Sequence, residues 1–175
     1  ATLFWPELDQ THARAALRRT LSALNAAAAL PWLRVEREQV TLTVDGDFDC
    51  DVHRFERCIT GCLPDGAFAA DRCRPLLEEA AQLYHGDFLE GFTLRDSAAF
   101  DDWQFFRAEG YRTMLAKVLE ALVQCAVQEH NWPEAIAHAR RRLTIDPLHE
   151  PAHRQLMQLY GWNDQRAAAL RQYQE

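Results

Sequence analysis

The 175 residues correspond to roughly one ordinary domain or one and a half, which excludes a large multidomain enzyme. Hydrophobic residues make up 48% of the chain, and only 7 Gly and 7 Pro interrupt it, so a packed and largely helical fold is expected. The 19 Lys and Arg against 26 Asp and Glu give a formal net charge of -7, which argues against a surface that binds nucleic acid or anionic lipid everywhere. Any nucleic-acid contact is therefore expected to be local.

The chain carries no apolar stretch near the roughly 20 residues that span a bilayer, and its first residues lack the features of a signal peptide. A cytoplasmic protein without membrane contact is expected.

A helix is predicted over Thr11 to Ala28, capped by Asp9 or Thr11. Its apolar positions follow helical spacing and are Ala13, Leu17, Leu21, Leu24 and Ala28. One adjoining polar face carries Arg14, Arg18, Ser22 and Asn25. Arg19 lies opposite the apolar side, so the helix presents an arginine-bearing surface.

Two short strands are predicted between Leu33 and Val44, after Pro31 ends the helix. Apolar and polar residues alternate there with a period of two, on both sides of a turn at Glu36 to Gln39. A helix followed by a hairpin is the second half of a winged helix. The alternative is an ordinary amphipathic helix with a solvated arginine face.

Acidic charge is unevenly spread along the chain. Residues 1 to 45 carry as many arginines as carboxylates, so the remainder holds the whole acidic surplus. This asymmetry predicts two parts with a boundary near Asp45 to Cys50.

Helices are also predicted over Asp51 to Cys62 and over about Phe68 to Leu83, and Asp96 or Ser97 then caps the longest helix. The buried side of that helix is expected to consist of Phe100, Trp103, Phe106, Met114, Leu115, Val118, Leu122 and Val123. Trp103 and Phe106 are expected to lie against Phe88 or Leu89.

The last part of the chain repeats itself. Leu122-Val123 recurs as Leu156-Met157 and Ala135-Ile136 as Ala169-Leu170, each after 34 residues, the period of tetratricopeptide helix pairs. Because a repeat unit buries its face only against a neighbour, further repeats or another domain are expected to follow Glu175 in the parent protein.

Cysteine usage gives little sign of a special site. Five cysteines form an odd number without a CxxC pair, which predicts reduced thiols: Cys50, Cys58, Cys62, Cys73 and Cys125. Cys58 and Cys62 would share a helical face, and His53 and His85 could complete a metal set with them in space. Ordinary packing of buried cysteine is the favoured interpretation, and no metal or cofactor is expected.

Several strings stand in an order that points to a known family. They are Leu3-Phe-Trp-Pro-Glu7, Ala13-Arg-Ala-Ala-Leu-Arg-Arg-Thr-Leu-Ser-Ala-Leu24, Asp51-Val-His-Arg-Phe55, Tyr84-His-Gly-Asp-Phe-Leu-Glu-Gly91 and Ile145-Asp-Pro-Leu-His-Glu-Pro-Ala-His153. Together with the repeat they resemble the bacterial transcriptional activation domain (BTAD) of SARP-type regulators, in which a winged helix precedes a tetratricopeptide-like helical domain.

The resemblance implies a mainly α fold in two domains. Residues 1–45 would be part of a winged-helix DNA-binding domain, and residues 46–175 would be the helical activation domain. The resemblance makes Thr11 to Ala28 the recognition helix and Leu33 to Val44 the wing. Candidate DNA contacts are Arg14, Arg18, Arg19 and Ser22 on the helix, with Arg37 at the wing tip.

Two departures from the family pattern limit the transfer of these roles. Asn25 stands where the family usually shows arginine. Ala1 falls halfway through the family's winged helix, so the preceding sheet and first helix are expected upstream in the parent protein.

The expected function is transcription regulation, with DNA, RNA polymerase, attached regulatory domains or a second copy in a homodimer as partners. The alternative is a tetratricopeptide interaction module in signalling that does not touch DNA.

An enzyme is the third hypothesis, but Asp101 and Asp102 are adjacent on a helix and point about 100° apart, so they cannot converge on one atom. Asp87, beside His85, is more simply a turn residue. No phosphate-loop, nucleophile-elbow or HExxH string occurs, and no catalytic residue is expected.

Overall fold

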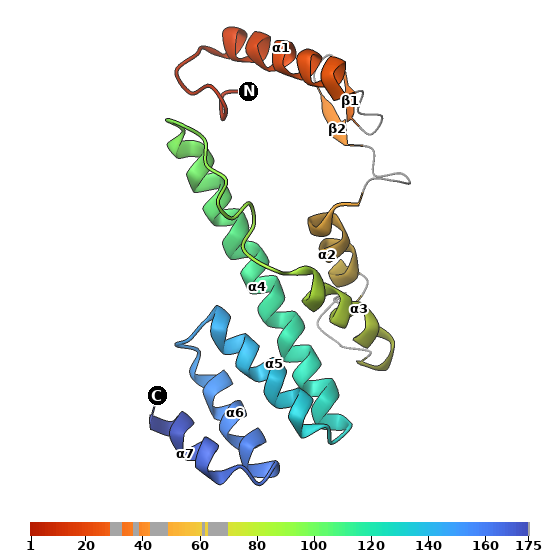
Figure 1. Cartoon of the computed structure of the whole chain (residues 1–175), viewed down its shortest axis with the longest axis vertical. Helices are drawn as coiled ribbons and strands as arrows, with labels where there is room; N and C mark the ends of the chain where they lie inside the picture. Colours follow the sequence, from red (N-terminus) through yellow and green to blue (C-terminus); the bar gives the residue numbers. More distant parts are fainter. Residues whose placement is uncertain (29–32, 37–38, 43–48, 61, 63–69, 175) are drawn as a thin grey trace. The chain divides into compact units, whose positions relative to one another are not determined.

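A computed structural model gives the fold of residues 1–28, 33–36, 39–42, 49–60, 62 and 70–174. Among these residues it contains seven helices and one two-stranded sheet (Figure 1). The helices are α1 (Gln10–Ala28), α2 (Asp51–Thr60), α3 (Ala70–Leu83), α4 (Ala98–Gln128), α5 (Trp132–Ile145), α6 (Glu150–Trp162) and α7 (Arg166–Gln174). The strands are β1 (Leu33–Val35) and β2 (Val40–Leu42). The prediction of a mainly α protein with one short hairpin is confirmed.

The chain divides into two compact units, which are described separately here. The first unit contains Ala1–Cys50 and Phe88–Ala108, and the second contains Asp51–Asp87 and Glu109–Glu175. Helix α4 contributes its first part to one unit and its remainder to the other.

Helix α1 of the first unit begins with a side-chain cap. Asp9 Oδ1 accepts from the backbone N–H groups of Thr11 and His12 at 2.9 and 3.1 Å, and Asp9 O accepts from Ala13 N. The cap therefore belongs to Asp9, one of the two residues expected for it. The His12 ring also hydrogen-bonds the Asp9 carboxylate, and this bond lowers the pKa of Asp9.

The hairpin that follows α1 is antiparallel, with Leu33 opposite Leu42, Arg34 opposite Thr41 and Val35 opposite Val40. Glu36 N donates to Gln39 O at 2.8 Å and closes the ladder. The two strands and the turn between them are those that the alternating sequence predicts.

Aromatic rings pack together around the start of α4. Phe100 is 2% exposed and lies 5.4 Å from the ring centre of Trp103 and 5.7 Å from that of Phe92. Ser97, next to the first residue of α4, donates its hydroxyl to Leu3 O at 2.6 Å. These contacts join the N-terminal segment and the start of α4 into one unit.

The predicted partner of Trp103 is correct and that of Phe106 is wrong. The Trp103 ring lies edge-on to Phe88, with 5.5 Å between the ring centres. Phe106 is 72% exposed and contacts the ring of Phe105 instead. The helical spacing placed Phe106 near the buried stripe, but that position lies where the first unit leaves α4 uncovered. Trp103 and Met114, also expected to be buried, are 37% and 38% exposed.

In the second unit, α2 and α3 pack against each other through a small apolar core. Phe55, Cys58 and Ile59 of α2 are buried, and so are Leu77 and Ala80 of α3. The spacing of the buried residues in α2 is the one that the sequence predicts.

The remaining helices repeat one local structure after 34 residues. The turn after α4 has His130 at φ 57° and Asn131 N donating to Ala126 O at 2.8 Å. The turn after α6 has Asp164 at φ 55° and Gln165 N donating to Tyr160 O at 2.8 Å. Each pair of residues is 34 positions apart, so the sequence repeat is also a repeat of backbone geometry.

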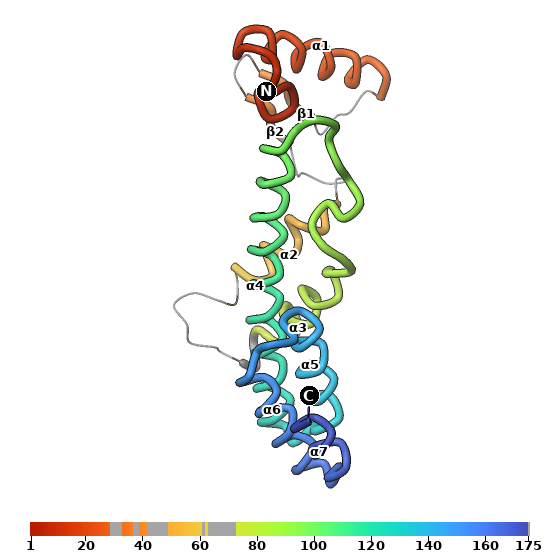
Figure 2. The backbone as a smooth tube through the Cα atoms, turned by 90° about the vertical axis from the view of Figure 1, so that its left-hand side faces the viewer, coloured from red at the N-terminus to blue at the C-terminus, as the bar shows by residue number. Residues whose placement is uncertain are grey.

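Helices α5, α6 and α7 pack as successive neighbours, as Figure 2 also shows. Their shared core contains the buried residues Val123, Ala126, Ala135, Ile136, Ala139, Leu156, Leu159 and Tyr160. The repeated pair Leu122 and Leu156 is buried in both copies, whereas Leu170, the counterpart of buried Ile136, is 67% exposed. The position that is buried at Ile136 in the first copy is therefore exposed at Leu170 in the second copy.

Candidate nucleic-acid interface

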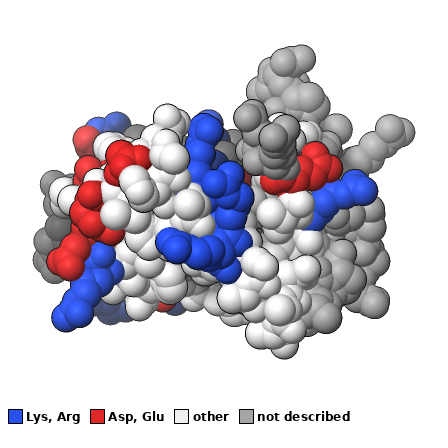
Figure 3. All heavy atoms as spheres, turned by 90° about the horizontal axis from the view of Figure 1, so that it is seen from above, with Lys and Arg blue, Asp and Glu red and all other residues white. Residues whose placement is uncertain are grey.

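The polar side of α1 is a basic surface in an acidic chain. Helix α1 contains three arginines and no carboxylate, although the whole chain has a net charge of -7. Arg14, Arg18, Arg19 and Ser22 are all exposed. Figure 3 shows a group of Lys and Arg side chains near the middle of this view, with further Lys and Arg side chains and several Asp and Glu side chains toward its edges. We call Arg14, Arg18, Arg19 and Ser22 the α1 polar face.

The geometry of an α-helix places Arg14, Arg18 and Ser22 on successive turns. Each step of four residues rises about 6 Å and turns only about 40° from the last, so the three side chains form a stripe. Arg19 lies about 100° further round from Arg18 and widens the basic surface.

These arginines make no ion pair with a carboxylate in the part of the chain that the structure describes. The contrast with the second unit is clear, since Arg74 and Arg112 are each held by two or more carboxylates there. The arginines of the α1 polar face therefore have no carboxylate partner among the described residues.

The hairpin contributes less to this surface. Arg34 on β1 is exposed, but it forms an ion pair with Glu36 at 3.7 Å. Arg37, expected at the wing tip, lies outside the described residues. Among the described residues, the candidate interface therefore consists of the face of one helix.

The apolar side of α1 is only partly covered. Ala13 is fully buried, Leu17 and Leu21 are half-buried, and Leu24 is 44% exposed. The spacing of these residues predicted one continuous buried stripe, whereas cover decreases toward the C-terminal end of the helix.

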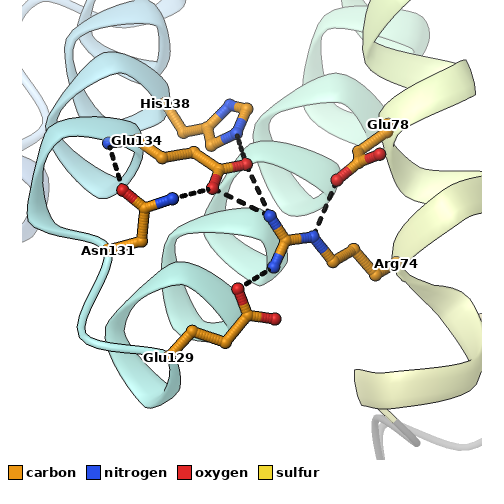
Figure 4. Close-up of polar contacts among 6 residues, drawn as sticks. All are labelled: Arg74, Glu78, Glu129, Asn131, Glu134 and His138. Atoms are coloured by element: carbon orange, nitrogen blue, oxygen red, sulfur yellow. Dashed lines mark hydrogen bonds and ion pairs between the residues drawn. The ribbon is translucent and has the colours of Figure 1, made fainter.

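The sequence did not predict the network of ion pairs around Arg74. Arg74 on α3 donates to Glu78 on its own helix and to Glu134 on α5, and it pairs with Glu129 after α4 (Figure 4). The spacing of Arg74 and Glu78 by four residues was a usable signal, but Glu129 and Glu134 are distant in sequence and become neighbours only through folding.

A second network fixes the turn that follows α3. Arg112 pairs with Asp87, whose Oδ1 also accepts from the Tyr84 hydroxyl at 3.0 Å. The hydrogen bond from Arg112 lowers the pKa of Asp87, and burial raises the pKa of Tyr84 to about 12. Asp87 is thus committed to a structural ion pair. This supports its assignment to the turn.

The second unit also has a pocket on its surface. A pocket of about 600 Å³ lies among α5, α6 and α7, lined by apolar side chains that include Leu143, Pro147 and Leu148. Leu148 is 91% exposed, and Arg140 lies at the same pocket with its Nε donating to the Tyr160 hydroxyl. Exposed apolar side chains beside a hollow are typical of an interaction surface.

The described residues contain neither a membrane-spanning helix nor a metal-binding group. No described helix is long and apolar enough to cross a membrane. In the same part of the chain, no group of three or more His, Cys, Asp or Glu side chains is placed to hold a metal ion.

Comparison with known proteins identifies the second part of the chain. The sequence model described as the bacterial transcriptional activator domain matches residues 50–175. This covers well over half of the chain, which therefore belongs to the bacterial transcriptional activator domain family and is a member of a transcription-regulator class. Neither the curated proteins nor the solved structures gave a match.

Proposed function

We propose that this protein regulates transcription by contacting DNA through the α1 polar face while its helical unit contacts protein. Membership of the bacterial transcriptional activator domain family indicates the general role in transcription. The observation that carries the DNA contact is a helix with three exposed arginines and no carboxylate in a chain of net charge -7. A local basic surface of this kind suits the phosphate backbone, and arginine also suits guanine edges.

The hairpin after α1 supports the same proposal. A helix followed at once by an antiparallel two-stranded ladder is the order found in the second half of a winged helix. In that arrangement α1 is the recognition helix, which reads base edges, and the hairpin is the wing, which contacts the backbone. We propose residues 1–45 as this DNA-contacting part and residues 46–175 as the activation domain.

The helical unit is proposed to bind RNA polymerase or regulatory domains attached to the same polypeptide. Its exposed apolar side chains support this role: Leu148, Trp162, Leu170 and Tyr173 are each more than half exposed. Patches of this kind on helical repeats mark contact surfaces.

The test is the affinity of the intact protein for duplex DNA, measured by fluorescence anisotropy over a series of salt concentrations. Neutralisation of phosphates releases counterions, so the proposal predicts binding that weakens linearly on a plot of log affinity against log salt. Absence of DNA binding even at low salt would favour the alternative, an interaction module that acts only on proteins.

A further inference from the structure

Two cysteine side chains meet between α2 and α3. Cys62 lies just beyond the end of α2 and Cys73 lies in α3. The Sγ of Cys62 is 3.7 Å from Cys73 O, and the Sγ of Cys73 is 3.9 Å from Cys62 O. Both residues are buried, at 2% and 8% exposed, and both are free thiols in this structure.

This reciprocal contact brings the two cysteines side by side. Each sulfur lies against the carbonyl oxygen of the other cysteine, and the Cys62 side chain also interacts directly with that of Cys73. A disulfide requires two facing cysteines with Cα atoms within about 7 Å. Two thiols that contact each other in this way are candidates for such a bond.

We propose that Cys62 and Cys73 are a redox modification site, which becomes a disulfide when the protein meets a low-molecular-weight disulfide such as oxidised glutathione. Two protein thiols are oxidised and one glutathione disulfide is reduced to two glutathione thiols. The first protein thiolate attacks a glutathione sulfur, which forms a mixed disulfide and expels one glutathione thiolate. The second protein thiolate then attacks the protein sulfur of that mixed disulfide and expels the other glutathione.

The order of the two attacks follows from the surroundings of the thiols. Burial, with added contributions from the thiols of Cys73 and Cys58, raises the pKa of Cys62 to about 12. A raised pKa lowers the thiolate fraction of Cys62 and slows its attack. We assign the first attack to Cys73, which is the more exposed of the two, and the second to Cys62. Because both thiols are buried, the reaction is slow and is followed to equilibrium.

Cys58 is the competing partner. It lies four residues before Cys62 and is also buried. It is close enough for its charge to affect the Cys62 pKa. However, Cys58 makes no reciprocal sulfur-to-backbone contact with either cysteine among the described residues. The structure therefore favours the pair Cys62 and Cys73 over any pair that includes Cys58.

The bond would tie α2 to α3 and restrict the unfolded chain, because it closes a loop between residues 11 apart. A loop of this length stabilises a domain of this size enough to raise Tm by roughly 5–10 °C. The site is independent of DNA binding, so either proposal can fail alone.

To test this, the intact protein is incubated with oxidised glutathione until equilibrium. Free thiols are then blocked, and the protein is digested with trypsin. Cleavage after Arg57 and Arg72 yields residues 58–72, and because the Arg74–Pro75 bond resists trypsin, the next peptide is 73–95. Mass spectrometry then shows whether these two peptides are joined. Tm is measured with and without a reducing agent.

The proposal predicts a joined pair of peptides that persists in Cys58→Ala and disappears in Cys62→Ala and in Cys73→Ala. It also predicts a higher Tm for the oxidised protein that falls back on reduction. Cys125→Ala is the matched control, since it removes another buried thiol and leaves the joined peptides in place. Peptides that carry only mixed disulfides with glutathione, or a joined pair that is lost in Cys58→Ala, would overturn the assignment.

Discussion

Arg74 and Glu134 connect helices α3 and α5 through two hydrogen bonds from one nitrogen: Nη2 of Arg74 donates to Oε1 and Oε2 of Glu134 at 2.7 and 2.8 Å (Figure 4). The same guanidinium binds Glu78 at 2.7 Å and pairs with Glu129. The Arg74 side chain is only 23% exposed. One partly buried guanidinium therefore neutralises part of the charge of three carboxylates.

The first prediction is that Arg74→Leu lowers the free energy of unfolding by about 1–3 kcal/mol, because it leaves three neighbouring carboxylates without their cation. Urea denaturation measures the effect. The control is Arg154→Leu, which removes an arginine from an ion pair with Glu150 whose two side chains are 70% and 72% exposed. That change is expected to cost less than about 0.5 kcal/mol, and equal losses in the two variants would contradict the structural role of Arg74.

The second prediction concerns His138, which lies 3.6 Å from Glu134 in the same network. Burial lowers the pKa of His138, although Glu134 opposes the effect. The unfolded chain therefore takes up this proton first, near pH 6.5, so the free energy of unfolding falls as the pH drops through this value toward the lower pKa of the folded state.

His138→Gln removes this contribution. The difference in the free energy of unfolding between pH 7 and pH 5.5 should be smaller in the variant than in the parent, while the two pH profiles run parallel above about pH 8. Identical pH dependence in both proteins throughout this range would show that His138 does not titrate differently in the two states.

The third prediction uses the aromatic cluster of the first unit. Trp103 packs on Phe88 and Phe100 but is 37% exposed, so Trp103→Ala is expected to lose about 1.5–3 kcal/mol, less than a fully buried aromatic loses. Phe106→Ala, at a residue that is 72% exposed, is expected to change stability by less than about 0.5 kcal/mol. Thermal unfolding of both variants measures the difference, and a larger loss at Phe106 would reverse the assignment.

Local patterns in the sequence predicted much of the fold. Asp9 is one of two predicted caps, and the alternation around the turn at Glu36 to Gln39 predicted the hairpin. The 34-residue repeat corresponds to two turns of the same geometry, at His130 and Asp164. These features depend on residues close in sequence or on a fixed period, which is the information that a single sequence holds.

Features that depend on tertiary neighbours could not be predicted. Phe106 has the spacing of a buried residue, but its exposure is decided by which elements cover that part of α4. The contact of Arg74 with Glu134 joins residues 60 apart, and no local pattern specifies it. In the candidate interface, the sequence predicted the exposed arginines on α1, whereas their lack of described carboxylate partners required the structure.

The fourth prediction separates two kinds of DNA contact on the α1 polar face. Arg14 lies nearer the N-terminus of α1, the end that enters the groove in the winged-helix arrangement, and is expected to read a base. Arg14→Ala should cost about 1–3 kcal/mol and relax the preference at one base pair, as measured with a set of operator variants.

Arg18, near the middle of the helix, is expected to hold a phosphate. Arg18→Ala should weaken binding to all sequences by the same factor and lower the salt slope by about one. The assignment is reversed if Arg18→Ala changes the preferred sequence and Arg14→Ala does not.

The central claim is that the α1 polar face is the DNA-contacting surface, and one measurement tests it most directly. The salt dependence of DNA affinity is compared among the intact protein, a variant with Arg14, Arg18 and Arg19 all changed to Ala, and the control Arg166→Ala, which removes an exposed arginine from α7. The account predicts that the triple variant loses most of its affinity and that its salt slope falls by about two to three, while the control behaves like the parent. Unchanged affinity and slope in the triple variant would contradict the claim, and the arginines of α1 would then be a solvated helix face.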